Sequence, residues 1–60
     1  MNEINQIKQI ARKEAAANPK LANSIWESAR LALGEIADGE SPAHELELFE
    51  DHIEELKGKS

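Results

Sequence analysis

The sequence predicts an all-α domain, a small antiparallel three-helix bundle. Apolar residues, including every isoleucine, recur at helical rather than alternating spacing, and Val, Thr and Tyr are absent, so strands are not expected. Two dipeptides, Asn18-Pro19 and Ser41-Pro42, each join an N-capping residue to a proline suited to a first helical turn. The joints are too short for linkers, so consecutive helices should lie side by side. The predicted helices lie near residues 2–17, 19–38 and 42–57.

The first predicted helix, residues 2–17, carries its apolar side chains on one side. An acidic residue near its start and two basic residues near its end suit the helix dipole. The spacing is that of an amphipathic helix with one buried face. The predicted buried residues are Ile4, Ile7, Ile10, Ala11 and Ala15.

The second predicted helix, residues 19–38, has the most continuous apolar stripe. Asn18 is the predicted N-cap, and Gly39 can take the left-handed conformation that ends a helix. Trp26 lies at the edge of the stripe, and we expect it to pack in the core because large apolar area is scarce in this chain. The stripe consists of Leu21, Ile25, Ala29, Ala32, Leu33 and Ile36.

The third predicted helix, residues 42–57, begins after Ser41, its expected N-cap. Its apolar seam is narrow, and we expect Phe49 to belong to the core. Because the first and third seams are both narrow, a core completed by homodimerisation is a second way to bury them. The seam consists of Leu46, Phe49, Ile53 and Leu56.

The length and composition predict one domain, residues 1–60, without covalent or metal staples. A domain of this size buries only about 60% of the surface that its unfolded chain exposes. The absence of Cys excludes disulfides, thiolate metal sites and cysteine nucleophiles, and nothing suggests an oxidising compartment. Polar or charged residues interrupt residues 1–14 every two or three positions, as neither a signal peptide nor a membrane span would allow. We therefore expect a cytoplasmic protein with no membrane partner.

The net charge of −5 is concentrated in the last third of the chain. Residues 1–17 carry 3 − 2 = +1, residues 18–38 carry 2 − 3 = −1, and residues 39–60 carry 2 − 7 = −5. A field of this sign disfavours direct binding to nucleic acid and attracts a basic partner. We expect a protein partner with a basic surface, for example a nucleic-acid-binding protein.

Five carboxylates of the third helix form the acidic arc: Glu47, Glu50, Asp51, Glu54 and Glu55. At about 100° per residue they fall on one continuous side, beside the apolar seam. Several are like-charge pairs four residues apart, and each such pair costs about 0.2–0.5 kcal/mol. The acidic arc is therefore either a docking face for a basic protein surface or a solvated face that keeps a small protein soluble.

Two leucines depart from the apolar stripes of their helices. Leu48 lies beside the acidic arc and is the predicted apolar anchor for a partner. Leu31 lies near Ser24 and Ser28, whose small side chains would let another helix approach closely, so these three residues are the predicted self-association surface. A single exposed leucine also occurs on many surfaces without any role.

No motif for catalysis, a cofactor or a metal is present. His44 and His52 are eight residues apart, too far for two imidazoles to share one metal ion, and His44 with Glu47 and Asp51 would make only a weak oxygen-rich site. No Ser or Cys stands at a motif spacing from either histidine, so no enzyme activity is expected. The sequence favours a small acidic protein-binding module, a regulator or inhibitor, and the alternative is a structural homodimer with no separate ligand.

Overall fold

The computed structural model describes residues 2–59, and these form three α-helices and one 3₁₀ turn. The described residues contain no strand, so the all-α prediction is confirmed. Met1 and Ser60, which the predicted domain includes, lie outside the described residues. The elements are α1 (Glu3–Ala17), η1 (Pro19–Leu21), α2 (Ala22–Ala37) and α3 (Pro42–Lys59).

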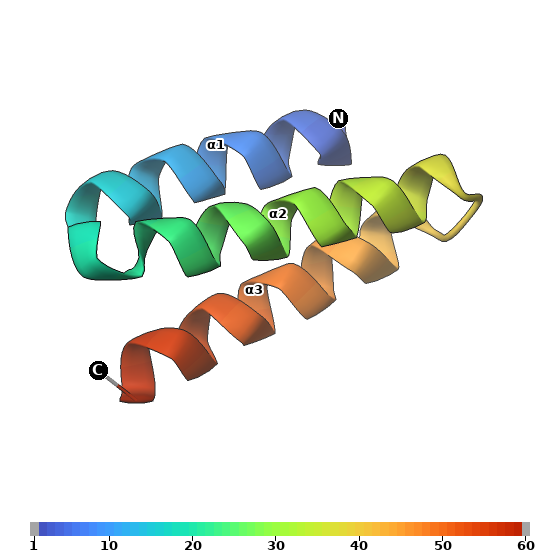
Figure 1. The fold of residues 1–60 in the computed structure, drawn as a ribbon. Helices are drawn as coiled ribbons and strands as arrows, with labels where there is room; N and C mark the ends of the chain where they lie inside the picture. Colours follow the sequence, from blue (N-terminus) through green and yellow to red (C-terminus); the bar gives the residue numbers. More distant parts are fainter. Residues whose placement is uncertain (1, 60) are drawn as a thin grey trace.

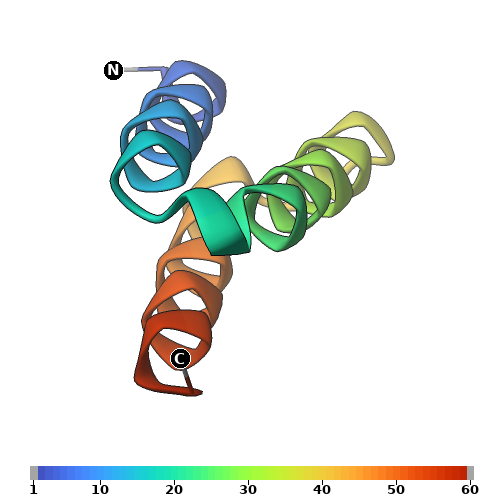
Figure 2. The same cartoon turned by 60° about the vertical axis from the view of Figure 1, so that its left-hand side comes forward.

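The three helices pack as an antiparallel bundle, as predicted. α1 and α2 run side by side in opposite directions, and α3 returns at an oblique angle to both (Figure 1). Each helix contacts the other two, and the view along the bundle shows them at the corners of a triangle (Figure 2). The described chain measures 32 × 17 × 16 Å, so the bundle is one helix length long and two helices wide.

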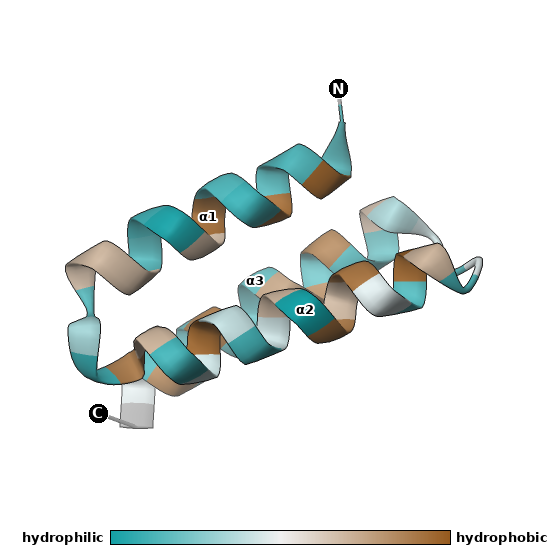
Figure 3. Ribbon diagram, turned by 45° about the horizontal axis from the view of Figure 1, so that its top comes forward, coloured by the Kyte–Doolittle hydropathy of each residue, from teal (hydrophilic) through white to brown (hydrophobic). Residues whose placement is uncertain are grey.

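The core is small and lies between all three helices. Ile7 of α1 and Ile25 of α2 are fully buried, and Phe49 of α3 is buried with them, as predicted. Ile53 and three alanines fill the rest of the centre, and the small alanines let the helices approach closely. Figure 3 shows the corresponding pattern on α1, which is mostly hydrophilic except for segments that fall toward the other helices. The buried apolar residues are Ile7, Ala11, Ile25, Ala29, Ala32, Phe49 and Ile53.

Trp26 is not a core residue, contrary to the prediction from the sequence. Its side chain is 40% exposed and borders a shallow surface depression with Asn23, Glu27 and Arg30. The reason is its position on the helix: the buried face of α2 contains Ile25, Ala29 and Ala32, and Trp26 stands about 100° round the helix from Ile25. The ring therefore stays at the edge of the interface.

Side-chain caps begin two of the helices. Asn2 Oδ1 accepts hydrogen bonds from the backbone N–H groups of Ile4, at 3.0 Å, and Asn5, at 3.4 Å. Ser41 Oγ accepts one from the backbone N–H of His44 at 3.3 Å, which confirms Ser41 as the N-cap of α3. α3 continues to Lys59, two residues past the predicted end, because a glycine such as Gly58 costs a helix only about 1 kcal/mol.

Asn18 ends α1 and also precedes η1, where its carbonyl accepts a hydrogen bond from the Leu21 N–H at 2.9 Å, but its side chain does not cap the second helix as predicted. Its side-chain Nδ2 donates to the backbone carbonyl of Glu14 at 3.0 Å and to Glu14 Oε1 at 3.3 Å. Its own backbone N–H donates to the same carbonyl at 2.8 Å. Asn18 is the single residue between α1 and η1, and its side chain bonds to the last turn of α1. Pro19 therefore begins η1 without a side-chain cap.

Gly39 ends α2 in the left-handed region, as predicted, with φ of 103°. The Gly39 N–H donates to the Ile36 carbonyl at 3.0 Å, and the Glu40 N–H donates to the Glu35 carbonyl at 3.0 Å. These two bonds are the pair that defines a Schellman motif. They reverse the chain direction within a few residues and so place α3 beside α2.

Replacing Gly39 by Ala should destabilise the fold by about 1–2 kcal/mol, because a Cβ disfavours the left-handed backbone. Gly34 offers a matched control: it lies in exposed helix, and no described atom is within 4 Å of an added Cβ. Gly34→Ala should therefore stabilise the fold by about 0.5–1 kcal/mol. Urea denaturation followed by circular dichroism measures both changes, and equal effects of the two variants would contradict the assigned turn.

Candidate functional site

The acidic arc is exposed along α3. Its five carboxylates, which are predicted from the sequence to contact a partner, all lie on the exposed surface of the helix. They do not share one environment, however, because α3 is flanked by α1 on one side and by α2 on the other. The arc therefore divides into an inner part beside α1 and an outer part.

Glu50 and Glu54 form the inner part. They line a shallow pocket of about 310 Å³ between α1 and α3. Two lysines and a third carboxylate border the same pocket, so much of the local negative charge is balanced within the chain. The lining residues are Ile10, Lys13, Glu14, Glu50, Ile53, Glu54 and Lys57.

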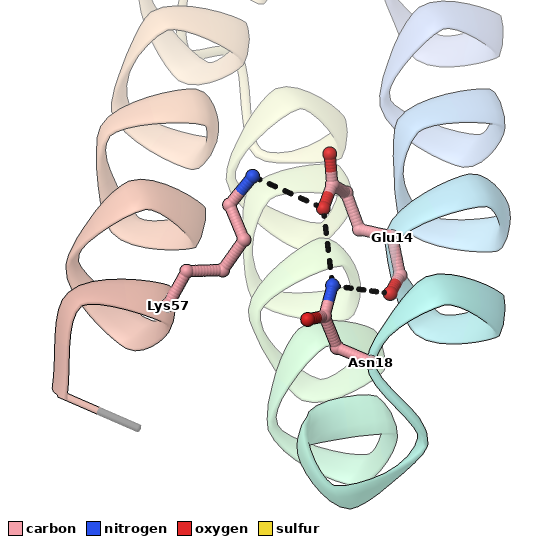
Figure 4. A network of polar contacts seen from close by, with 3 residues as sticks. All are labelled: Glu14, Asn18 and Lys57. Carbon is pink, nitrogen blue, oxygen red and sulfur yellow. Dashed lines mark hydrogen bonds and ion pairs between the residues drawn. The ribbon is translucent and has the colours of Figure 1, made fainter.

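An ion pair holds the far end of α3 against α1. Lys57 Nζ lies 3.3 Å from Glu14 Oε1, and the same oxygen accepts the hydrogen bond from Asn18 (Figure 4). The Lys57 and Glu14 side chains are 42% and 23% exposed, and ion pairs this accessible to water contribute at most about 1 kcal/mol. The network therefore links the C-terminal part of α3 to the end of α1 with only a small gain in stability.

The outer part of the arc consists of Glu47, Asp51 and Glu55, which do not line the α1–α3 pocket. Glu47 and Asp51 stand one helical turn apart, so their carboxylates repel each other across exposed surface. Of the residues that the sequence selected, these are the ones best placed to meet another molecule.

A second depression, the α2–α3 groove, lies on the other side of α3. It has a volume of about 250 Å³, and half of its lining residues come from each helix. The buried side chains of Ala32 and Phe49 belong to its lining. α2 contributes Ser28, Leu31, Ala32 and Glu35, and α3 contributes Glu45, Leu48, Phe49 and His52.

Leu31 and Leu48, which the sequence assigned to separate surfaces, both line this groove. Leu31 is 64% exposed and Leu48 is 48% exposed, the two highest values among the exposed large apolar residues of the described chain. A signal for their meeting exists in the sequence: Leu31 stands eight residues before Gly39, and Leu48 stands nine residues after it. Two residues at nearly equal distances from a tight antiparallel turn lie at nearly the same level along the two helices.

Ser28 and His52 form a hydrogen bond across the groove, which sequence reasoning missed. Ser28 Oγ contacts His52 Nδ1, and Ser28 is only 7% exposed. The helix that approaches the small side chain of Ser28 is therefore α3 of the same chain, while Ser24 and Leu31, the other two residues of the predicted self-association surface, stay exposed.

The Ser28–His52 contact fixes the register of α2 against α3. Glu35 lies seven residues after Ser28, and Glu45 lies seven residues before His52, so both glutamates are displaced toward the turn by the same number of residues. Both carboxylates accordingly line the turn end of the groove. Glu45 is only 8% exposed, so it belongs to this groove rather than to the solvent-facing acidic surface.

A hydroxyl beside an imidazole is also the beginning of a hydrolytic site, but the surroundings of Ser28 do not provide the rest. Ser28 lies in the middle of α2, where the helix itself uses the backbone N–H groups that an oxyanion would need. Among residues 2–59, no three His, Asp or Glu side chains are arranged to hold a metal ion. The Ser28–His52 pair is accounted for as an interhelix contact.

Comparisons with known proteins found no relative: no protein-family model, no curated protein and no solved structure matches the chain. In the described part of the chain, no helix is long and apolar enough to cross a membrane. Function must therefore be argued from the two surfaces of α3, the outer acidic arc and the α2–α3 groove.

Replacing Ser28 by Ala should cost about 1 kcal/mol more than replacing Ser24 by Ala, because only Ser28 loses an interhelix hydrogen bond. Both serines lie in α2, so both variants gain the same helix propensity. Urea denaturation gives the difference in the free energy of unfolding. If the two variants are equally stable, the Ser28–His52 contact does not hold α3 in place.

Proposed function

We propose that the chain is a small protein-binding module that docks the outer acidic arc of α3 on a basic surface of a partner protein. The observation that carries this proposal is the position of Glu47 and Asp51, which are exposed one turn apart and lie outside the pocket containing Lys13 and Lys57. Carboxylates placed this way cost the helix stability, and a cationic partner would relieve that cost.

The mechanism is electrostatic steering followed by competition. The −5 charge of residues 39–60 (2 − 7) attracts a basic surface over roughly a Debye length, about 8 Å at physiological salt. A nucleic-acid-binding protein offers such a surface, and a module that covers it would act as a regulator or inhibitor. We place this activity in the cytoplasm, with direct contact to neither nucleic acid nor membrane.

Reversing Glu47 and Asp51 to Lys should abolish capture of the partner, because the outer arc then repels a basic surface. Glu27→Lys with Asn5→Lys and Gln9→Lys is the matched control: all three residues are exposed, the change in net charge is the same +4, and they line neither the acidic arc nor the α2–α3 groove. Wild type and the two variants serve as baits at low salt in extracts of the source cell, with captured proteins identified by mass spectrometry. A partner retained equally by all three baits sinks the proposal.

A second candidate is a structural homodimer, which the exposure of Leu31 and Leu48 on one face favours. Two copies would bury these leucines against each other and enlarge a small core. Analytical ultracentrifugation decides between the candidates: a dimer weakened by Leu31→Ser and Leu48→Ser supports self-association, and a monomer at high micromolar concentration excludes it.

A further inference from the structure

The α2–α3 groove has the features of a helix-binding site. Leu31 and Leu48 are its exposed apolar residues, and buried Phe49 belongs to the same lining. The α2 residues that line the groove, from Ser28 to Glu35, span about 10 Å along the helix axis. Two turns of a bound helix have about the same length. Amphipathic helices bind such grooves through apolar side chains spaced three or four residues apart.

The two ends of the groove differ in charge. Glu35 and Glu45 line the end next to the turn, and the turn itself adds the exposed acidic residues Asp38 and Glu40. The opposite end carries the Ser28–His52 pair. An occupant therefore meets negative charge at one end and a hydroxyl and an imidazole at the other.

One of the carboxylates at the acidic end, Glu35, destabilises α2 when no cation is near it. Glu35 lies in the last turns of α2, where the helix dipole is negative, and the last turn contains no basic residue. Glu45 is mostly covered and lies in the first turn of α3, where the helix dipole favours a carboxylate, so its negative charge is held at this end of the groove. A cationic group placed between these carboxylates would offset the unfavourable position of Glu35.

We propose that the α2–α3 groove binds an amphipathic helix of a partner protein, which seats apolar side chains between Leu31 and Leu48 and places Lys or Arg near Glu35 and Glu45. The N-terminus of the bound helix lies at the turn end, because its positive dipole faces the carboxylates there. This inference rests on the proposed function in one respect: it takes the occupant to be a segment of the basic partner.

Charge also argues against a second copy as the occupant. The groove includes α3, and residues 39–60 carry 2 − 7 = −5. Pairing two copies through this face would bring two such segments together, whereas a basic helix neutralises one.

The test is a titration of the full-length ¹⁵N-labelled chain with a synthetic helical peptide of about 14 residues, about four turns. The probe carries leucines along one face and lysines in its first two turns. Two comparison peptides have the lysines moved to the last two turns, or replaced by glutamates. We expect chemical-shift changes centred on Leu31, Ala32, Leu48 and Phe49, with the N-terminal-lysine peptide binding most tightly and the glutamate peptide at least about tenfold more weakly.

Leu31→Ser with Leu48→Ser should weaken binding of the lysine peptide by at least about tenfold, because two apolar contacts are lost. Both leucines are largely exposed, so circular dichroism should show an unchanged fold. Trp26→Ser is the control, since it removes exposed apolar surface outside the groove. It should leave the affinity unchanged.

Four outcomes overturn the inference: no binding up to about 1 mM, equal binding by the leucine variant, shift changes that map to α1, or equal affinity for the lysine and glutamate peptides. Equal affinity for the two lysine peptides overturns the assigned direction. Shift changes at the groove on raising protein concentration without peptide would assign it to a second copy.

The same variants separate this inference from the proposed function. If the natural partner is lost with Glu47→Lys and Asp51→Lys but kept by the leucine variant, the acidic arc docks the partner and the groove does not. If the partner is lost only with the leucine variant, the groove binds it and docking by the arc is wrong.

Discussion

The turn at Gly39 is the constraint on which the surface of this protein depends. A left-handed glycine and two backbone hydrogen bonds reverse the chain between α2 and α3, and Ser28 and His52 then set how far the helices slide. Given that register, Leu31 must lie near Leu48. The apolar groove, and the position of Glu35 and Glu45 at one end of it, are consequences of this turn.

The elements were predictable because their signals are local. Ser41 and Gly39 each determine a helix end through bonds within five residues, and the three predicted helix ranges differ from the observed ones by only a few residues. Asn18 failed because two helices compete for the same side chain, and α1 takes it. The local sequence identifies a capping residue, but it does not determine which of two adjacent helices that residue caps.

Tertiary features were less predictable. Trp26 lies at the edge of the apolar stripe of α2, and helical spacing does not determine how much of that edge the neighbouring helices cover. The division of the acidic arc depends on which side of α3 faces α1, which helical spacing does not determine. The presence of Leu31 and Leu48 in one groove could have been predicted from the sequence, because the two leucines lie at nearly equal distances from Gly39.

The small core has a further consequence, for the lifetime of the protein. With Ile7 and Ile25 as the only large side chains among those described that are fully buried, and with no disulfide, folding has little stability in reserve. A ligand that binds only the folded chain adds about 2.7 kcal/mol when its free concentration is 100 times its dissociation constant. That gain is a large share of the total for a domain of this size. If the chain binds the partner proposed above, mass action would make the abundance of the chain follow that of the partner, because unbound chains unfold and are degraded more often.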